Sequence, residues 1–236
     1  MKGILLAGGN GTRLAPLTNV VNKHLLPVYD KPMILYPLET LKRSGLTDIL
    51  LITGGEHIGR FIEFLGDGSR FGVSLTYRVQ EKAGGIAEAL SLCEQFAAGD
   101  EVSVMLGDNV FSPTFKPQKS KYGCTVFLVN VDEESAKRFG CAVIEGDKVV
   151  EVEEKPQQPR STLAMTGYYM FSSRAFEVIR ELAPSARGEL EVTDLINYYV
   201  QNGDCGYAMV EGHWADVGTT DSLLSASLAI REETNI

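Results

Sequence analysis

The sequence has few of the residues and segments that mark several protein classes. Its 236 residues include four cysteines, three histidines and one tryptophan, and no Cys-x-x-Cys pair. Zinc sites and redox pairs usually need such close spacing, so we expect buried thiols in a reducing compartment. The N-terminal apolar run is too short for a signal peptide, and no stretch approaches the roughly 20 apolar residues of a membrane span. We therefore expect a cytoplasmic protein with no membrane segment.

Clustered positive charge is also missing. Lys and Arg total 22 against 31 Asp and Glu, which gives a formal net charge of −9. No basic run supplies a face for nucleic acid, so we expect no nucleic-acid partner. An acidic protein that handles phosphates must place its few cations locally or use a metal ion. Apolar residues make up 44% of the chain, which is typical of a globular domain.

The first half of the chain alternates between short apolar runs and longer helical patterns. The predicted strands are 3–7, 49–53, 73–79 and 102–106, and the predicted helices are 31–44, 57–65 and 85–97. For the first helix we expect Asp30 as the N-cap and Pro32 at the first position, with a kink or a late start at Pro37. This alternation predicts an α/β fold with a mostly parallel sheet and helices on both faces.

The second half has a different pattern, with strands that follow one another closely. Strands are predicted at 124–129, 141–144, 149–152 and 167–171, followed by helices at 174–182, 192–201 and 220–231. The closely spaced strands indicate an antiparallel excursion on the same sheet. Loops are expected at 116–121 and 156–161, and a frayed polar tail at 231–236. Because no repeat or low-complexity linker interrupts the chain, we expect one domain over residues 1–236.

A glycine-rich loop, Gly8-Gly9-Asn10-Gly11-Thr12-Arg13, follows the first predicted strand directly. Glycines let backbone N–H groups line a concave anion site, and the cation that follows strengthens a phosphate-binding interpretation. A plain strand-to-helix turn would need only one or two glycines. A P-loop is excluded because no Lys-Ser or Lys-Thr follows. A dinucleotide fingerprint lacks its third glycine, and Pro16 interrupts the helix that it would open.

Four charged residues elsewhere are candidates for phosphate or metal binding. Lys23 stands between the glycine loop and a Leu-Leu-Pro turn, where it either contacts phosphate or is a solvated surface group. Asp108 ends a parallel-type strand and Asp216 precedes the last helix, so both could ligate Mg²⁺, or cap a turn and a helix. Lys155 ends another strand, where it either contacts a phosphate or sugar or is a cap or surface group. No Ser-His-Asp or Cys-His spacing suggests a covalent nucleophile.

Several ordered motifs together carry a resemblance to a known family. The motifs are 6–14 (LAGGNGTRL), 23–28 (KHLLPV), 30–34 (DKPMI), 106–109 (LGDN), 154–156 (EKP), 166–169 (TGYY), 187–194 (RGELEVTD) and 214–219 (WADVGT). In this order they resemble the sugar nucleotidylyltransferases, especially the glucose-1-phosphate thymidylyltransferases among them. The likeness runs from residue 3 to about residue 230.

The resemblance implies a fold and an activity. The fold is a single-domain, Rossmann-like three-layer sandwich of the nucleotide-diphospho-sugar transferase type. The activity is transfer of a nucleoside monophosphate from dTTP or UTP to glucose 1-phosphate, which gives dTDP-glucose or UDP-glucose and pyrophosphate with the help of Mg²⁺. A homo-oligomer is a further expectation. The alternative is a non-catalytic nucleotide-sugar-binding regulator on the same fold, and a dinucleotide-dependent oxidoreductase is disfavoured by the broken fingerprint.

The resemblance also implies roles for individual residues. Nucleotide contacts fall on Leu6, Gly8, Gly9, Gly11, Thr12, Arg13, Gln80, Gly85 and Asp108. Sugar-phosphate contacts fall on Gly140, Glu154, Lys155, Tyr169 and Arg187. The catalytic groups are Arg13, Lys23, Asp108 and Lys155, and the Mg²⁺ ligands are Asp108 and Asp216.

The sequence departs from the family pattern in three places. His24 stands where the family commonly has Gln, and residues 82–84 replace a stretch that usually contains Pro and Asp. The chain also ends soon after the helix that follows Asp216, whereas longer members continue with a helical extension.

Overall fold

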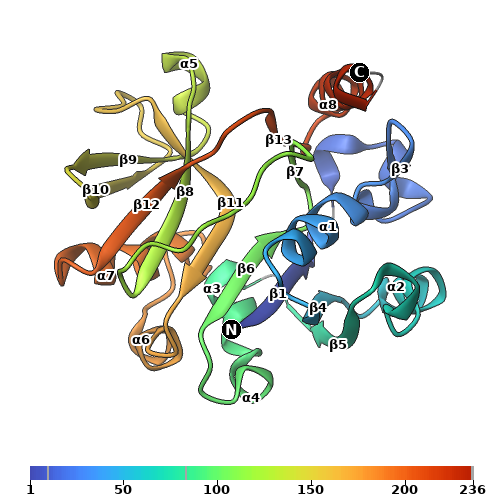
Figure 1. The fold of residues 1–236 in the computed structure, drawn as a ribbon, viewed down its shortest axis with the longest axis horizontal. Helices are drawn as coiled ribbons and strands as arrows, with labels where there is room; N and C mark the ends of the chain where they lie inside the picture. Colours follow the sequence, from blue (N-terminus) through green and yellow to red (C-terminus); the bar gives the residue numbers. More distant parts are fainter. Residues whose placement is uncertain (10, 83, 235–236) are drawn as a thin grey trace. The chain divides into compact units, whose positions relative to one another are not determined.

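The computed structural model describes residues 1–9, 11–82 and 84–234, and the chain divides into two compact units. Unit 1 comprises residues 1–2, 84–104 and 118–210, and unit 2 comprises residues 3–83, 105–117 and 211–236. Figure 1 follows the chain from blue to red and labels its elements. The architecture is mixed α/β, as predicted. Within the described ranges, no helix combines the length and apolarity that crossing a bilayer requires.

Unit 2 contains a parallel arrangement of three predicted strands. They are β1 (Lys2–Ala7), β4 (Asp48–Gly54) and β5 (Ser74–Gln80), in the order β5-β4-β1. Gly3 pairs with Ile49 and Asp48 with Ser74, and both pairings are parallel. All of β4 except its two end residues is buried, because a parallel strand with both faces covered needs an apolar side chain at nearly every position.

The first helix of unit 2 begins later than its sequence pattern suggests. Helix α1 spans Leu35–Arg43, while β2 (Pro27–Val28) and β3 (Lys31–Pro32) form a short antiparallel pair before it. The prediction of Asp30 as the cap and Pro32 as the first helical residue is therefore wrong. The late start expected from Pro37 is confirmed. Pro37 lies in the first turn, where its missing N–H would have had no acceptor within the helix.

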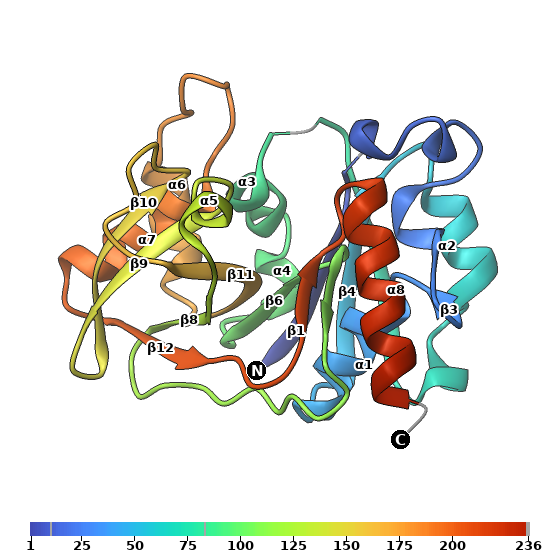
Figure 2. The same ribbon diagram turned by 90° about the horizontal axis from the view of Figure 1, so that it is seen from above.

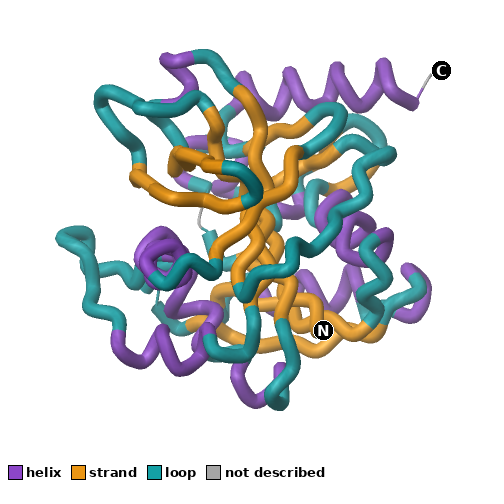
Figure 3. Tube along the Cα trace, turned by 60° about the vertical axis from the view of Figure 1, so that its left-hand side comes forward, coloured by secondary structure: helices purple, strands orange, loops and turns teal. Residues whose placement is uncertain are grey.

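Unit 2 also contains short 3₁₀ helices and two further α-helices. The 3₁₀ helices are η1 (Thr12–Leu14), η2 (Leu17–Asn19), η3 (Lys23–Leu25) and η4 (Ser69–Phe71). Helix α2 spans Ile58–Leu65, as expected, and α8 spans Thr220–Thr234. The tail predicted to fray from Arg231 is helical up to Thr234, and Figure 3 shows α8 as one continuous coil. Residues 235–236 lie outside the described residues.

A two-stranded ribbon in unit 2 has no counterpart among the predicted elements. It pairs β7 (Asn109–Phe111) with β13 (Trp214–Asp216), and Asp216 lies opposite Asn109. Helix α8, drawn in red in Figure 2, contacts β13. Its inner face joins an apolar cluster made of Val28, Met33, Tyr36, Val110, Val217, Ala226 and Ile230. This cluster holds the ribbon at a defined position beside α8.

Unit 1 is built on the predicted antiparallel strands, which close into a barrel. Its strands are β8 (Cys124–Asn130), β9 (Gly140–Glu145), β10 (Lys148–Glu154), β11 (Leu163–Phe171) and β12 (Cys205–Met209). Their order is β11-β8-β12-β10-β9 (Figure 1). Ala164 of β11 also pairs with Cys141 of β9, which closes the ring. The pairings are antiparallel except for β8 with β12, and neither β12 nor the closure was predicted.

The helices of unit 1 differ from the prediction in two ways: the helix predicted at 85–97 is divided, and the short helix at 133–136 was not predicted. They are α3 (Ile86–Ser91), α4 (Glu94–Ala97), α5 (Glu133–Ala136), α6 (Ala175–Glu181) and α7 (Val192–Gln201). The single helix predicted at 85–97 is interrupted at residues 92–93, so it becomes α3 and α4. Helices α3, α6 and α7 pack against one another. The strand β6 (Val102–Leu106) carries the chain from unit 1 into unit 2.

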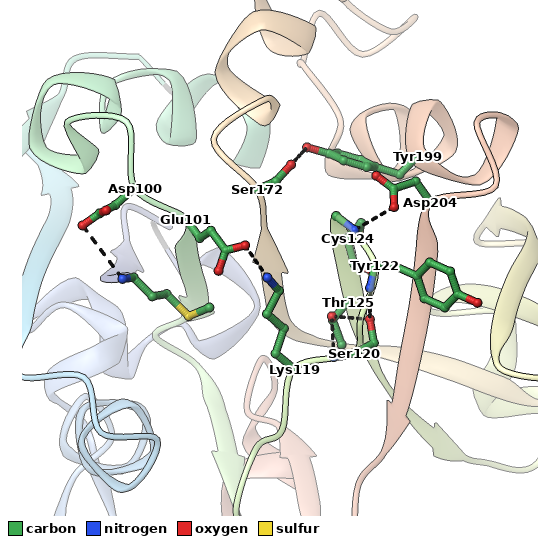
Figure 4. Close-up of polar contacts among 12 residues, drawn as sticks. Asp100, Glu101, Lys119, Ser120, Tyr122, Cys124, Thr125, Ser172, Tyr199 and Asp204 are labelled. Carbon is green, nitrogen blue, oxygen red and sulfur yellow. Dashed lines mark hydrogen bonds and ion pairs between the residues drawn. The ribbon is translucent and has the colours of Figure 1, made fainter.

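Polar contacts anchor the start of β8 in unit 1 (Figure 4). The backbone N–H of Gly123 donates to the Asp204 carboxylate at 2.9 Å, and the hydroxyls of Ser172 and Tyr199 lie 3.0 Å apart. Cys124 follows at once and lies opposite Cys205 in the parallel register. The four cysteines form no disulfide bond with one another and are buried, as predicted.

Candidate nucleotide and sugar-phosphate sites

The glycine loop of unit 2 packs along the side chain of Lys23. Gly11 has a φ of 63°, and a Cβ atom there would lie 2.8 Å from the Lys23 Cβ. A Cβ atom at Gly9 would lie 3.1 Å from the Lys23 Nζ. Any larger side chain at these positions would displace the ammonium group. Asn10 of this loop lies outside the described residues.

Lys23 forms an ion pair with Asp108. Its Nζ atom lies 2.5 Å from Asp108 Oδ2, and the two side chains are only 11% and 13% exposed. Burial alone raises the pKa of Asp108, but the neighbouring Lys23 ammonium and the hydrogen bonds to the carboxylate outweigh it and lower the pKa. The site therefore contains a fixed carboxylate that stays ionised beside a fixed cation.

Asp216 lies close to Asp108 because of the β7–β13 ribbon. Asp216 pairs with Asn109, and the N–H of Val217 donates to the backbone oxygen of Asp108 at 2.8 Å. Among the described residues, no three His, Cys, Asp or Glu side chains could hold a metal ion by themselves. Two carboxylates completed by substrate phosphates are a common way to bind Mg²⁺. The residues present therefore fit this ion in its complex with a nucleotide.

Arg13 lies beside this carboxylate pair. A Cβ atom at Gly218 would lie 2.7 Å from Nη2 of Arg13 and 3.6 Å from Oδ2 of Asp216. The guanidinium group therefore rests on the Gly218 backbone, near Asp216. Arg13 belongs to η1 and is exposed, so it can contact an anionic ligand.

Two other predicted nucleotide contacts, Gln80 and Leu6, lie next to the loop and next to Asp108, respectively. A Cβ atom at Gly8 would lie 2.8 Å from Oε1 of Gln80, at the end of β5. The backbone oxygen of Leu6 accepts from Gly107 at 2.8 Å, directly before Asp108. Unit 2 thus contains Leu6, Gly8, Gly9, Gly11, Thr12, Arg13, Lys23, Gln80, Asp108 and Asp216, whose roles stay predictions.

His24 is a buried neighbour of the ion pair. Its Nδ1 atom lies 2.8 Å from Asn22 Oδ1, and a Cβ atom at Gly107 would lie 2.7 Å from its Cδ2. Burial, and then the Lys23 charge, lower the pKa of His24 to about 3. The imidazole is therefore neutral at ordinary pH and adds no second positive charge next to Lys23.

This buried imidazole should make the protein sensitive to acid. The folded pKa of about 3 lies below the ordinary value of 6.5, so between these values the unfolded chain binds a proton that the folded chain does not. The free energy of unfolding should therefore fall as the pH falls through that window. We expect His24→Gln to lose less thermal stability than the wild type between pH 7 and about pH 4.5. Melting curves would measure this, with His57→Gln as the control, and equal losses in wild type and His24→Gln would contradict it.

In unit 1, Glu154 is held in place by two neighbours. It ends β10, and its Oε2 atom accepts from the Thr193 hydroxyl at 2.8 Å. Its Oε1 atom lies 3.3 Å from the Lys155 ammonium. A Cβ atom at Gly140 would lie 3.2 Å from Oε2, so glycine leaves room for this carboxylate. Lys155 has a φ of 46°, an unfavourable value for a residue with a side chain, and such strain often marks functional positions.

The other predicted sugar-phosphate contacts lie elsewhere in unit 1. Arg187 donates to Glu191 through Nε at 3.2 Å and Nη2 at 2.9 Å. Tyr169 is buried in the wall of the barrel, where its ring stacks on Phe171. Thr193 and Glu191, which contact the predicted residues, were not identified individually from the sequence. Their only signal was membership of the 187–194 motif.

Gly85, a predicted nucleotide contact, also belongs to unit 1. It has a φ of 98°, and a Cβ atom there would clash with the backbone oxygen of Leu190. Leu190 N donates to Gly84 at 2.8 Å, and Leu190 O accepts from Ala87 at 3.1 Å. The start of α3 is therefore tied to the segment that precedes α7, and only glycine suits this close approach.

The structure describes a mixed α/β protein in which a glycine-rich loop lies beside the Lys23–Asp108 ion pair. Residues 2–233 match the model of the Nucleotidyl transferase family. The chain is 45% identical over 245 residues to the glucose-1-phosphate thymidylyltransferase of Neisseria meningitidis, covering 100% of this chain and 84% of that protein. It is 44% identical to the enzyme of the same name from an Actinoplanes species, covering 96% and 77%. The chain belongs to the nucleotidyl transferase family.

Solved structures agree with this membership. A Bacillus anthracis crystal structure, assigned as a glucose-1-phosphate thymidylyltransferase and solved with sucrose, has a TM-score of 0.90 and 49% identity, covering 98% of this chain and 96% of that one. A UDP-glucose pyrophosphorylase complexed with UDP-glucose has a TM-score of 0.86 at 22% identity, covering 98% of each chain, and shows the shared fold alone.

Proposed function

We propose that this chain is a glucose-1-phosphate thymidylyltransferase. It transfers the dTMP group of dTTP to glucose 1-phosphate and produces dTDP-glucose and pyrophosphate, a step in dTDP-sugar synthesis. The observation that carries the proposal is the Lys23–Asp108 ion pair, which lies against the glycine loop with Asp216 on the adjoining ribbon. Curated relatives that share this name match nearly the whole chain.

The reaction needs no protein nucleophile. A phosphate oxygen of glucose 1-phosphate attacks the α-phosphorus of dTTP, a new P–O bond forms, and the bond to the bridging β-phosphate oxygen breaks as pyrophosphate leaves. Catalysis therefore depends on positioning and charge neutralisation. UTP is the second triphosphate to test, because uracil offers Gln80, a proposed contact to the base, the same hydrogen-bonding groups as thymine.

The residues of unit 2 bind the triphosphate. The backbone N–H groups of Gly8, Gly9, Gly11 and Thr12 face the phosphates, with Leu6 beside them. Arg13 and Lys23 neutralise the charge that develops on the departing pyrophosphate. Asp108 and Asp216 hold Mg²⁺, which when bound neutralises phosphate charge and orients the α-phosphate.

The residues of unit 1 bind the sugar phosphate. Glu154, whose carboxylate is accommodated next to Gly140, accepts hydrogen bonds from sugar hydroxyls, and Tyr169 forms part of the barrel wall. Lys155 and Arg187 pair with the phosphate. We further propose that residues 1–236 act as one nucleotidylyltransferase domain with a three-layer arrangement, since the family match spans residues 2–233. A homo-oligomer and a cytoplasmic location stay predictions.

A substrate matrix tests the proposal. The purified protein is incubated with dTTP, UTP, ATP, GTP and CTP, each paired with glucose, galactose or mannose 1-phosphate, and pyrophosphate release is measured. We expect the highest kcat/KM for dTTP with glucose 1-phosphate. Binding of dTDP-glucose without turnover of any pair would instead indicate a regulator on this fold.

We also expect turnover to require a divalent metal ion. The carboxylates of Asp108 and Asp216 could hold such an ion, whose charge would offset the charge of the two anionic substrates. Pyrophosphate release should stop in excess chelator and return when Mg²⁺ is restored. Undiminished activity in chelator would rule out the metal role.

A further inference from the structure

A chain of two hydrogen bonds leads from Trp214 to Asp108. The indole Nε1 of Trp214 donates to Oδ1 of Asn109 at 2.7 Å. The amide Nδ2 of Asn109 then donates to Oδ1 of Asp108 at 3.1 Å. Asn109 is 2% exposed, so its amide is shielded from bulk water. Trp214 and Asn109 lie on the facing strands β13 and β7.

The direction of these two hydrogen bonds follows from which groups can donate and which can accept. An indole N–H can only donate, so the carbonyl end of the Asn109 amide must face Trp214. The NH₂ end therefore faces Asp108, and it can only donate to the carboxylate. The Asp108 carboxylate, which only accepts, favours the same orientation of the amide, because the amide oxygen would repel it. Trp214 thus adds a second hydrogen bond that holds Asn109 in the orientation that stabilises an ionised Asp108.

The two oxygens of Asp108 consequently have different partners. Oδ1 accepts from Asn109, while Oδ2 lies 2.5 Å from the Lys23 ammonium. Contacts on both oxygens fix the plane of the carboxylate before any ligand arrives. Groups that hydrogen-bond to a metal ligand commonly orient it, and their loss typically weakens metal binding by about 10- to 100-fold.

We propose that Trp214 and Asn109 are positioning residues that hold the Asp108 carboxylate in the orientation that receives the metal–nucleotide complex. This inference rests on the proposed function, since that function gives Asp108 its ligand. Neither residue needs to touch the reacting atoms for this role.

Two substitutions test the two hydrogen bonds from Trp214 through Asn109 to Asp108, which we call the relay. Trp214→Phe keeps an aromatic ring on β13 but removes the donor, and Asn109→Asp keeps the shape but replaces the donor to Asp108 with a carboxylate. We expect the Mg²⁺ concentration for half-maximal rate to rise about 3- to 10-fold in Trp214→Phe and about 10- to 100-fold in Asn109→Asp. Saturating Mg²⁺ should restore most of the kcat of Trp214→Phe. Mn²⁺ binding in the presence of dTTP, followed by electron paramagnetic resonance, should weaken by the same factors.

The matched control is Tyr207→Phe in unit 1. It removes a single side-chain hydrogen bond, from the Tyr207 hydroxyl to the oxygen of Gly146 at 3.1 Å, and should leave the metal dependence unchanged. If Asn109→Asp does not fold, Trp214→Phe still tests the relay, because it buries no new charge.

A spectroscopic measurement tests the relay without turnover. The sequence has one tryptophan, so the indole N–H gives a single cross-peak in a ¹H–¹⁵N spectrum of the metal-free protein. In the wild type we expect this proton to exchange slowly with water, and in Asn109→Ala the peak should shift and exchange faster. An unprotected indole proton in the wild type, or an unchanged metal affinity in folded Trp214→Phe, would overturn the relay. Failure of the wild type to release pyrophosphate would instead overturn the proposed function, while the indole measurement still decides whether the hydrogen bond exists.

Discussion

Asp108→Asn should fold normally and lose most of its activity. The substitution keeps the shape of the side chain but removes the negative charge that faces Lys23 and the proposed metal. Loss of a metal-binding charge should cost several kcal/mol of transition-state stabilisation, which corresponds to a loss in kcat/KM of at least about a hundred-fold. The fold should be kept, because the amide oxygen of the new side chain can still accept from Lys23. Its NH₂ group then faces the Asn109 amide and cannot accept from it, so a small drop in melting temperature is expected.

The measurement combines steady-state pyrophosphate release with a melting curve for each variant. Asp204→Asn is the control, since it neutralises a carboxylate that binds the Gly123 N–H and lies outside both proposed sites. That variant should lose stability rather than kcat. If Asp108→Asn is as active as the wild type, or is simply unfolded, the role of Asp108 as a metal ligand is wrong.

Arg13→Lys should lower kcat by on the order of ten- to a thousand-fold, in line with the loss of one preorganised donor. The guanidinium group rests on Gly218 beside Asp216, where its planar fork can meet two phosphate oxygens at once. A lysine supplies a point charge on a flexible chain and cannot reproduce that geometry. The KM for glucose 1-phosphate should change less, because Arg13 lies with the triphosphate-binding residues.

A structural role for Arg13 predicts a different result. If Arg13 only anchors the loop, Arg13→Lys would shift the melting temperature slightly and leave turnover almost unchanged. Arg60→Lys on α2 serves as the control, since the Arg60 side chain is 75% exposed and forms an ion pair with Glu63, away from the proposed triphosphate contacts. An unchanged kcat with a shifted melting point would falsify the catalytic interpretation of Arg13.

The sequence by itself determined the features that depend on near neighbours. The strands β1, β4, β5 and β6 begin and end within one residue of their predicted bounds, and α7 begins and ends at the predicted residues 192 and 201. The glycine loop was predicted to bind phosphate because backbone flexibility and a following cation are local properties. Even the late start of α1 followed from the geometry of Pro37.

Only the tertiary structure decided which distant groups meet. Lys23 and Asp108 are 85 positions apart, and nothing local indicates that they form a buried ion pair. The three-residue strands β7 and β13 carry too short a pattern to be predicted, yet their register places Asp216 opposite Asn109 and allows Trp214 to orient that amide. The closure of the barrel through Ala164 and Cys141 is likewise a long-range pairing. Local propensity specifies the elements, whereas burial of apolar faces and satisfaction of buried polar groups select the long-range pairings that assemble the two candidate sites.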